Sequence, residues 1–178
     1  MTVIPAVPIR HDHPEAACGA PMASVTMRAM ELGDLDAVMA IEREAYRLPW
    51  TTGNFADSVR SGYWARLRLD RGDPVGYLVA MAGVAEVHLL NLTVAPAQQH
   101  RGHGRAMLEG LAERARALHA ETLWLEVRES NLRAQDLYRR FGFETVGLRK
   151  RYYPAQGGGR EDAIVMSLRL VGDDDAPV

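Results

Sequence analysis

Residues 98–108, QQHRGHGRAML, constrain the fold of this chain more than any other stretch of its sequence. They follow an apolar segment typical of a strand, EVHLLNLTVA (86–95), and precede an alanine- and leucine-rich segment typical of a helix, from about residue 103 to 119. Two glycines, Gly102 and Gly104, allow backbone amides to approach a ligand without a Cβ atom in the way. A helix that begins here turns its free N–H groups and the positive end of its dipole outward. This junction therefore predicts a site for an anion, most naturally a phosphate.

The hydrophobic pattern of the rest of the chain predicts an α/β fold. Strands are expected at residues 24–30, 63–69, 74–83, 86–95, 122–127, 143–149 and 162–170, and helices at 35–46, 51–62, 103–119 and 131–141. Asp34 is expected to cap the first helix, Thr51 or Thr52 the second, and Gly142 to close the fourth. The second and third strands form a hairpin, whereas the alternation of strands and helices in the second half predicts parallel crossovers. We expect a mixed central sheet with helices on both faces.

The length of 178 residues favours a single domain, which we place at residues 24–171. Residues 1–23 contain four prolines and no sustained period, so they are expected to form a flexible extension, and residues 172–178 a flexible acidic tail. The HDH triplet at 11–13 is too weak a pattern to indicate a metal site. Cys18 is the only cysteine, which excludes an internal disulfide and suits a reducing compartment.

Charge and hydropathy argue against several classes of function. A net charge of -2 and a pI of about 6.3 do not supply the positive field that nucleic-acid binding needs. The chain has no run of about 18 apolar residues, and its N-terminus lacks the charged and then apolar layout of a signal peptide. We expect a cytoplasmic protein, a monomer or weak dimer, without a nucleic-acid or membrane partner. His100 and His103 lack a supporting carboxylate or cysteine cluster, so no metal is expected.

The residues of the glycine turn discriminate among phosphate ligands. A Walker loop needs Lys-Ser or Lys-Thr after its second glycine, where Arg105 and Ala106 stand, and a dinucleotide fingerprint needs a glycine in place of Met107. Residues 99–104 instead follow the pattern Gln/Arg-x-x-Gly-x-Gly/Ala. This pattern resembles the pyrophosphate loop of the GNAT acyltransferase superfamily, which implies binding of acetyl-coenzyme A. The alternative is a tight turn whose glycines only permit close packing.

Two later stretches, TLWLEVRESNLRAQDLYRRFGF (122–143) and RYYPAQGGGREDAIVMSL (151–168), resemble one branch of that superfamily. That branch is the RimI-type N-terminal alanine acetyltransferases of ribosomal proteins, and the similarity runs from about Met27 to Leu170. It implies the GNAT fold and transfer of an acetyl group from acetyl-coenzyme A to the N-terminal alanine of a ribosomal protein. Since the only cysteine lies in the extension, we expect direct transfer in a ternary complex rather than a covalent acyl-enzyme.

Glu126 is the candidate general base. In the strand TLWLEV, Trp124 and Glu126 share one face, and the apolar Leu123, Leu125 and Val127 share the other. A carboxylate on a strand covered on both faces is costly to desolvate, which favours a raised pKa and a base role. The alternative is an ion pair with an arginine such as Arg128 or Arg149. The resemblance implies the general-base role.

Tyr138 and Asn131 belong to the helix at 131–141. Helical spacing places Tyr138 on one face with Ala134, Leu137 and Phe141, which by itself predicts a core tyrosine. The resemblance implies instead that its hydroxyl acts as general acid for the thiolate of the coenzyme. Asn131 opens the helix as a cap, and the resemblance adds a contact with the coenzyme.

The remaining coenzyme contacts follow from the resemblance. Leu92, Thr93 and Val94 would bind the pantetheine arm through their backbone, with a bulge that separates their strand from the next parallel strand and frees an amide for the thioester oxygen. The pyrophosphate would be held mainly by backbone amides of the turn, with charge added by the arginines: His100, Arg101, Gly102, His103, Gly104 and Arg105.

The acceptor is less constrained by the sequence. Tyr152 and Tyr153 are expected to wall a narrow slot for a small first residue, or else to pack as ordinary loop residues, while Glu161 or Asp162 would attract a basic residue of the peptide. An α-amine, with a pKa of about 8, is roughly 300-fold more often neutral near pH 7 than a lysine with a pKa of about 10.4. The alternatives are a lysine or small-amine acetyltransferase and a non-catalytic coenzyme-binding module, and the presence of both Glu126 and Tyr138 argues against the module.

Overall fold

A computed structural model of the chain describes residues 25–170. The predicted extension 1–23, with its HDH triplet and Cys18, and the predicted tail 172–178 lie outside the described residues.

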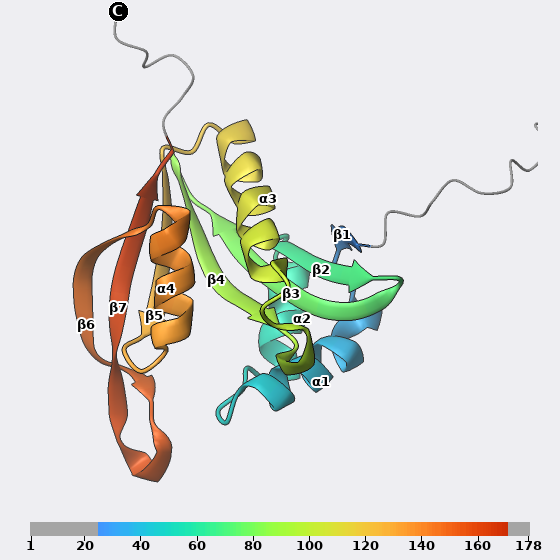
Figure 1. Cartoon of the computed structure of the whole chain (residues 1–178), viewed down its shortest axis with the longest axis horizontal. Helices are drawn as coiled ribbons and strands as arrows, with labels where there is room; N and C mark the ends of the chain where they lie inside the picture. Colours follow the sequence, from blue (N-terminus) through green and yellow to red (C-terminus); the bar gives the residue numbers. More distant parts are fainter. Residues whose placement is uncertain (1–24, 171–178) are drawn as a thin grey trace, which may run out of the picture.

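The described part of the chain forms one mixed sheet with helices packed on it (Figure 1). The strands are β1 (Val25–Ala29), β2 (Trp64–Asp70), β3 (Asp73–Ala82), β4 (Glu86–Val94), β5 (Thr122–Arg128), β6 (Glu144–Pro154) and β7 (Arg160–Arg169). The α-helices are α1 (Leu35–Ala45), α2 (Thr52–Arg60), α3 (His103–Ala117) and α4 (Leu132–Phe141), and short 3-10 turns are η1 (Leu32–Asp34), η2 (Pro96–Gln98) and η3 (Gln156–Gly158). The predicted elements are thus present, and the α/β class is confirmed.

Two apolar cores hold the helices to opposite faces of the sheet. One core joins α3 and α4 to strands β3, β4, β5 and β7, with Leu108, Leu111 and Leu123 fully buried in it. The other core joins α1 and α2 to β2 and β3 around Phe55 and Tyr77. The rings of these two residues pack edge to face, with their centroids 5.2 Å apart. The prediction of helices on both faces is therefore confirmed.

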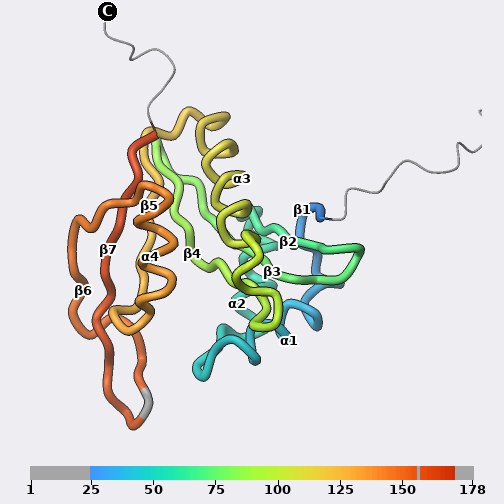
Figure 2. The backbone as a smooth tube through the Cα atoms, viewed as in Figure 1, coloured from blue at the N-terminus to red at the C-terminus, as the bar shows by residue number. Residues whose placement is uncertain are grey.

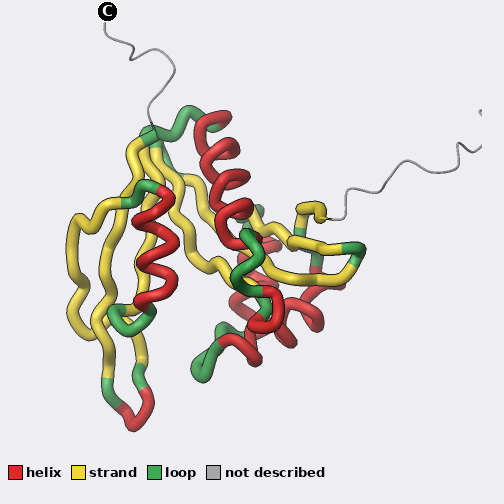
Figure 3. Tube along the Cα trace, viewed as in Figure 1, coloured by secondary structure: helices red, strands yellow, loops and turns green. Residues whose placement is uncertain are grey.

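The strand order β1-β2-β3-β4-β5-β7-β6 corrects the predicted topology of the second half. Helix α3 does connect two neighbouring parallel strands, β4 and β5. Helix α4, however, leads to β6 at the far edge, and β7 inserts between β5 and β6, antiparallel to both. Strands β4, β5 and β6 therefore run in the same direction, as the predicted parallel crossovers require. Strand β6 does not pair with β5, however, because the β6–β7 hairpin, whose turn stands out at the lower end of Figure 3, folds back so that β7 lies between them.

Strands β4 and β5 pair over only part of their length. Their register runs from Glu86 opposite Thr122 to Leu89 opposite Leu125, and beyond that point the two strands diverge (Figure 2). The register of β4 with β3 slips at the same place, where Leu90 is the extra residue of a bulge. The predicted bulge and separation are present, and they open the sheet at the residues expected to bind the coenzyme.

The ends of the helices agree with the sequence except at Asp34. The Thr51 side chain caps α2, the Asn131 side chain accepts a hydrogen bond from the backbone N–H of Ala134 at 3.1 Å, and Gly142 ends α4 with a φ of 114°. Asp34 precedes α1 but does not cap it through its side chain. Its carboxylate pairs instead with Arg28 of β1 at 2.7 Å, a partner that local sequence rules do not consider.

Gly76 of β3 allows this strand to approach Thr93 of β4 closely. A Cβ atom at this buried position of β3 would lie 2.7 Å from the carbonyl oxygen of Thr93 in β4. Replacing Gly76 by alanine should therefore push the two strands apart and lower the free energy of unfolding by about 1–3 kcal/mol. Urea unfolding measures this change.

The matched control is Gly33→Ala, because a Cβ atom there meets nothing within 4 Å. It should change the stability by no more than about 0.5 kcal/mol. Equal stability of the two variants would contradict the close approach of β3 to β4.

Candidate active site

Two cavities, of about 440 and 450 Å³, meet where β4 and β5 diverge. They share part of their walls: Tyr46, Leu92, Asn131, Ala134 and Tyr138 line both. The first cavity lies beside the glycine turn, and the second lies beside Glu126. Two ligands bound side by side would therefore meet at Tyr138.

The first cavity gathers most of the residues predicted to bind the coenzyme. Its lining includes Leu92, Thr93, Val94, His100, Gly102, His103, Gly104, Arg105, Asn131 and Tyr138. Arg101 is exposed and does not belong to the lining, so the structure separates it from the others. Arg105 does line the cavity, where its guanidinium pairs with Glu109 at 2.9 Å.

The turn that begins α3 presents free backbone donors. Gly102 is the N-cap, with a φ of 82° that glycine adopts without strain. The first amide of the helix to reach a helical partner is that of Ala106, which donates to the carbonyl oxygen of Gly102 at 3.0 Å. The amides of the residues between them have no such partner and are available to an anion at the positive end of the helix dipole.

Gln99 fixes this turn between β4 and α4. Its side-chain nitrogen donates to the carbonyl oxygen of Val94 at 3.0 Å, and its side-chain oxygen accepts a hydrogen bond from Arg133. The predicted glutamine of the loop pattern thus ties the turn to both walls of the first cavity.

His103 is buried, with 5% of its surface exposed. Its Nδ1 accepts a hydrogen bond from Nε of Arg68 at 3.1 Å, so the proton of the neutral ring resides on Nε2. Burial lowers the pKa of His103, and so does the neighbouring Arg68 guanidinium, because both disfavour the protonated ring. Arg101 lowers this pKa further, whereas Asp70 raises it.

Two residues that line the first cavity carry a buried polar atom without a hydrogen-bond partner among the described residues. Among residues 25–170, the buried side-chain atoms without a hydrogen-bond partner are Nε1 of Trp64, Oε1 of Gln98 and Nε2 of His103, and the last two belong to residues that line this cavity. Gly104 lines it too, and a Cβ atom there would come within 3.1 Å of Leu137. Together with the free amides of the turn, this lining is compatible with a phosphate-bearing ligand.

Glu126 lines the second cavity, but the prediction that its strand is covered on both faces is wrong. Helices α1 and α2 pack mainly on β2, β3 and β4, and the Glu126 side chain keeps 18% of its surface exposed. The predicted alternative, an ion pair, is present: Oε1 of Glu126 lies 3.2 Å from Nη2 of Arg149. The pair engages one carboxylate oxygen, so the other can still accept a proton.

Tyr138 combines the two interpretations left open by the sequence. It is 7% exposed and packs against Phe143 with ring centroids 5.8 Å apart, as a core tyrosine would. It also lines both cavities, and its hydroxyl makes no hydrogen bond within the described part of the chain. Burial raises the pKa of Tyr138, so its hydroxyl stays protonated and can donate.

The tyrosine pair of β6 divides between two environments. Tyr153 lines the second cavity, and its hydroxyl donates to the backbone carbonyl of Glu126 at 2.9 Å. Tyr152 is 40% exposed, lies outside the lining, and carries the guanidinium of Arg149 over its ring at 5.4 Å. The predicted slot is thus walled by one tyrosine rather than two.

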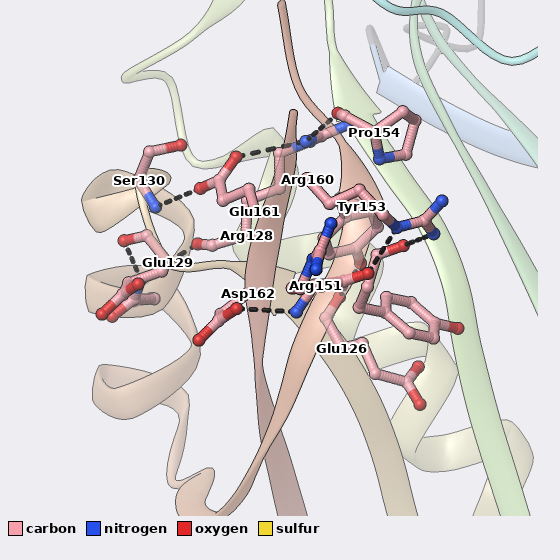
Figure 4. A network of polar contacts seen from close by, with 12 residues as sticks. Glu126, Arg128, Glu129, Ser130, Arg151, Tyr153, Pro154, Arg160, Glu161 and Asp162 are labelled. Atoms are coloured by element: carbon pink, nitrogen blue, oxygen red, sulfur yellow. Dashed lines mark hydrogen bonds and ion pairs between the residues drawn. The ribbon is translucent and has the colours of Figure 1, made fainter. Parts of the chain in front are cut away.

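Glu161 and Asp162 are both engaged by the chain itself (Figure 4). Glu161 accepts from the backbone N–H of Ser130 at 2.7 Å and pairs with Arg128 at 3.2 Å. Asp162 accepts from the backbone N–H of Arg151 at 2.7 Å. These bonds tie the β6–β7 hairpin to itself and to the end of β5, which gives no support to the expected attraction of a basic acceptor residue.

Sequence reasoning missed a buried carboxylate beside the second cavity. Glu42 of α1 is 1% exposed, and it accepts hydrogen bonds from the backbone N–H of Trp50 at 2.7 Å and from the hydroxyl of Tyr77. Burial raises the pKa of Glu42, while these donors oppose the rise. Its position three and four residues after the apolar Met39 and Val38 is the signal that could have placed it on the buried face of the helix.

Within residues 25–170, no helix is long and apolar enough to cross a membrane. The same residues contain no group of three or more His, Cys, Asp or Glu side chains arranged to hold a metal ion.

Comparisons with known proteins connect this site to a family. The model of the Acetyltransferase (GNAT) family matches residues 35–143. The ribosomal protein bS18-alanine N-acetyltransferase of Escherichia coli (strain K12) is 37% identical over 145 residues, which are 82% of this chain and 97% of that protein. A protein of the same name from Haemophilus ducreyi is 34% identical over 137 residues, which are 77% of this chain and 94% of that protein.

Solved structures share the fold. The crystal structure of the ribosomal-protein-S18-alanine N-acetyltransferase from Escherichia coli matches with a TM-score of 0.77 at 34% identity, over 86% of this chain and 99% of that one. The structure of yncA from Salmonella typhimurium, solved with its cofactor acetyl-CoA, matches with a TM-score of 0.68 over 87% of this chain and 98% of that one. At 20% identity, the second likeness concerns the fold alone.

The lowered pKa of His103 generates a prediction about stability. An unfolded histidine takes up a proton below about pH 6.5, whereas His103 in the folded chain resists it. Below about pH 6.5 the unfolded chain therefore binds a proton that the folded chain does not, and this difference favours unfolding. The free energy of unfolding is thus unaffected by His103 above about pH 6.5 and decreases as the pH falls from there toward the lowered pKa of the folded state. Glutamine can accept the hydrogen bond from Arg68 but does not titrate. Between about pH 7 and pH 5, the melting temperature of His103→Gln should therefore fall less than that of the unmodified protein.

The control is His119→Asn, at an exposed position with a positive φ that asparagine tolerates. It should keep the pH dependence of the unmodified protein. A His103→Gln melting profile parallel to that of the unmodified protein would show that His103 does not resist protonation.

Proposed function

Because the chain belongs to the GNAT acetyltransferase family, we propose that it transfers an acetyl group from acetyl-coenzyme A to the α-amine of an N-terminal alanine. Ribosomal protein bS18 is the proposed acceptor, which places the reaction in the cytoplasm. The names of relatives that align over nearly their whole length support this acceptor. The observation that carries the proposal is the meeting of two cavities at Tyr138, with Glu126 in the second.

The first cavity is the proposed coenzyme site. The free amides after Gly102 would hold the diphosphate, with Arg105 adding positive charge at the rim. Residues 92–94 of β4 still pair with β3, but their other edge is open because β5 has diverged there, and this edge would bond the amide-containing arm. When bound, the coenzyme supplies an acetyl thioester at the junction of the two cavities. Because both cavities share walls, donor and acceptor can be bound together, which supports direct transfer.

Two side chains at this junction would move protons. Glu126 takes one proton from the attacking amine as the nitrogen forms its bond to the acetyl carbon. Tyr138 gives its hydroxyl proton to the sulfur as the carbon–sulfur bond breaks, so the thiolate leaves as a thiol. Glu126 lies on β5 and Tyr138 on α4, which packs on the opposite face of that strand, and both line the second cavity.

We predict that Glu126→Gln lowers kcat on the order of 100-fold near pH 7 and leaves coenzyme affinity nearly unchanged. The substitution removes a proton acceptor and little volume, and Glu126 does not line the first cavity. Steady-state kinetics and calorimetric titration with acetyl-coenzyme A measure the two quantities. Glu129→Gln, at an exposed neighbouring position, is the control. Turnover of Glu126→Gln at the control rate would remove this residue from the mechanism.

The acceptor is tested with two peptides. One begins Ala-Arg with a free α-amine, and the other has the same sequence with a blocked α-amine and an internal lysine. We expect acetylation, followed by mass spectrometry, on the free α-amine. Efficient acetylation of the blocked peptide alone would reject the N-terminal acceptor and favour the lysine alternative.

A further inference from the structure

A chain of hydrogen bonds leads from the buried Glu42 to the junction of the two cavities. Besides Trp50 and Tyr77, the side chain of Asn91 hydrogen-bonds the Glu42 carboxylate. The side chain of Asn91 also bonds Oγ1 of Thr93, at 3.0 Å, and Oγ1 of Thr93 lies 3.0 Å from the hydroxyl of Tyr46. The chain thus crosses from α1 to β4 and returns to the residue that ends α1.

The direction of each bond follows from the number of protons available. Oγ1 of Thr93 donates to Oδ1 of Asn91, so the amide nitrogen of Asn91 is the atom left to donate to the Glu42 carboxylate. The single hydroxyl proton of Thr93 is donated to that oxygen. Tyr46 must therefore be the donor in its bond to Thr93.

The hydroxyl of Tyr46 consequently has lone pairs to offer and no proton left to give. Burial raises the pKa of Tyr46, which keeps this proton in place. Tyr46 lines both cavities and lies within electrostatic range of the hydroxyls of Tyr138 and Tyr153. The residue that carries this acceptor-only oxygen is thus part of the wall that the two cavities share.

We propose that Tyr46 is a further catalytic residue, whose oxygen accepts a hydrogen bond from one N–H of the acceptor amine. This inference rests on the proposed function, in that the acceptor is a primary amine. A neutral primary amine has two N–H groups. One proton passes to Glu126, and the other stays on nitrogen and bonds Tyr46, which directs the nitrogen lone pair toward the acetyl carbon. Tyr46 gains and loses no proton in the reaction.

The first test is Tyr46→Phe, which keeps the ring and removes the oxygen. We expect kcat/KM for the Ala-Arg peptide to fall roughly tenfold, as the loss of one well-placed hydrogen bond predicts. Because Tyr46 also lines the first cavity, the Kd of acetyl-coenzyme A is measured in parallel and should change less than kcat/KM. The lost bond to Thr93 should lower the melting temperature by only a few degrees. The control is Tyr63→Phe, a partly buried tyrosine that packs on the same core but lines neither cavity. Unchanged kcat/KM in Tyr46→Phe would overturn the proposal.

A second measurement separates amine recognition from a structural effect. A peptide beginning with N-methylalanine has only one N–H when neutral, and Glu126 needs it. The unmodified enzyme should therefore prefer alanine over N-methylalanine more strongly than Tyr46→Phe does. If Tyr46→Phe lowers kcat/KM by the same factor for the alanine and N-methylalanine peptides, the hydroxyl acts through structure alone. That result would also overturn the proposal.

Failure of the proposed function gives a different result. If only a lysine-bearing peptide is acetylated, the N-terminal acceptor is rejected, and Tyr46→Phe is then assayed with lysine and N-methyllysine peptides. A lysine amine also has two N–H groups when neutral, so the preference for the primary amine should again weaken in Tyr46→Phe. An undiminished preference would overturn the role of Tyr46 for that acceptor too.

Discussion

The end of pairing between β4 and β5 is the constraint on which the rest of the structure depends. Beyond Leu89 and Leu125 each strand has backbone groups that the other no longer satisfies. Unpaired backbone groups inside a protein need a partner, and the gap between the strands gives access to a ligand that can supply one. Both cavities lie along this gap, and the bulge at Leu90 keeps it open from the β3 side.

Local features of the sequence predicted much of the fold and part of the site. The junction at residues 98–108 located the turn and the start of α3. The period-2 pattern of β5 placed Glu126 on the face opposite its apolar residues, and the structure packs that apolar face against α3 and α4. These predictions succeeded because each depends on residues close together in the chain. Asn131 and Gly142 belong to the same class, since a cap is settled within one turn of helix.

The predictions that failed depend on contacts between distant segments. The insertion of β7 beside β5 is decided by the β6–β7 hairpin, which periodicity in β5 cannot reveal. The partner of Asp34 comes from β1, and the partial exposure of Glu126 depends on α1 and α2, which pack mainly on β2, β3 and β4. Glu42 went unnoticed for a related reason: a buried carboxylate is costly alone, and its donors come from a loop and from β3 and β4.

The two cavities draw on different parts of the chain. The lining of the first comes from residues 45–46, 92–105 and 131–140, largely one continuous middle region around α3 and α4. The second also needs Leu48–Trp50, which precede α2, and Tyr153–Pro154, which end β6. Substitutions in these two outer segments can therefore reshape the second cavity while the lining of the first stays unchanged, so the two cavities can vary independently of each other.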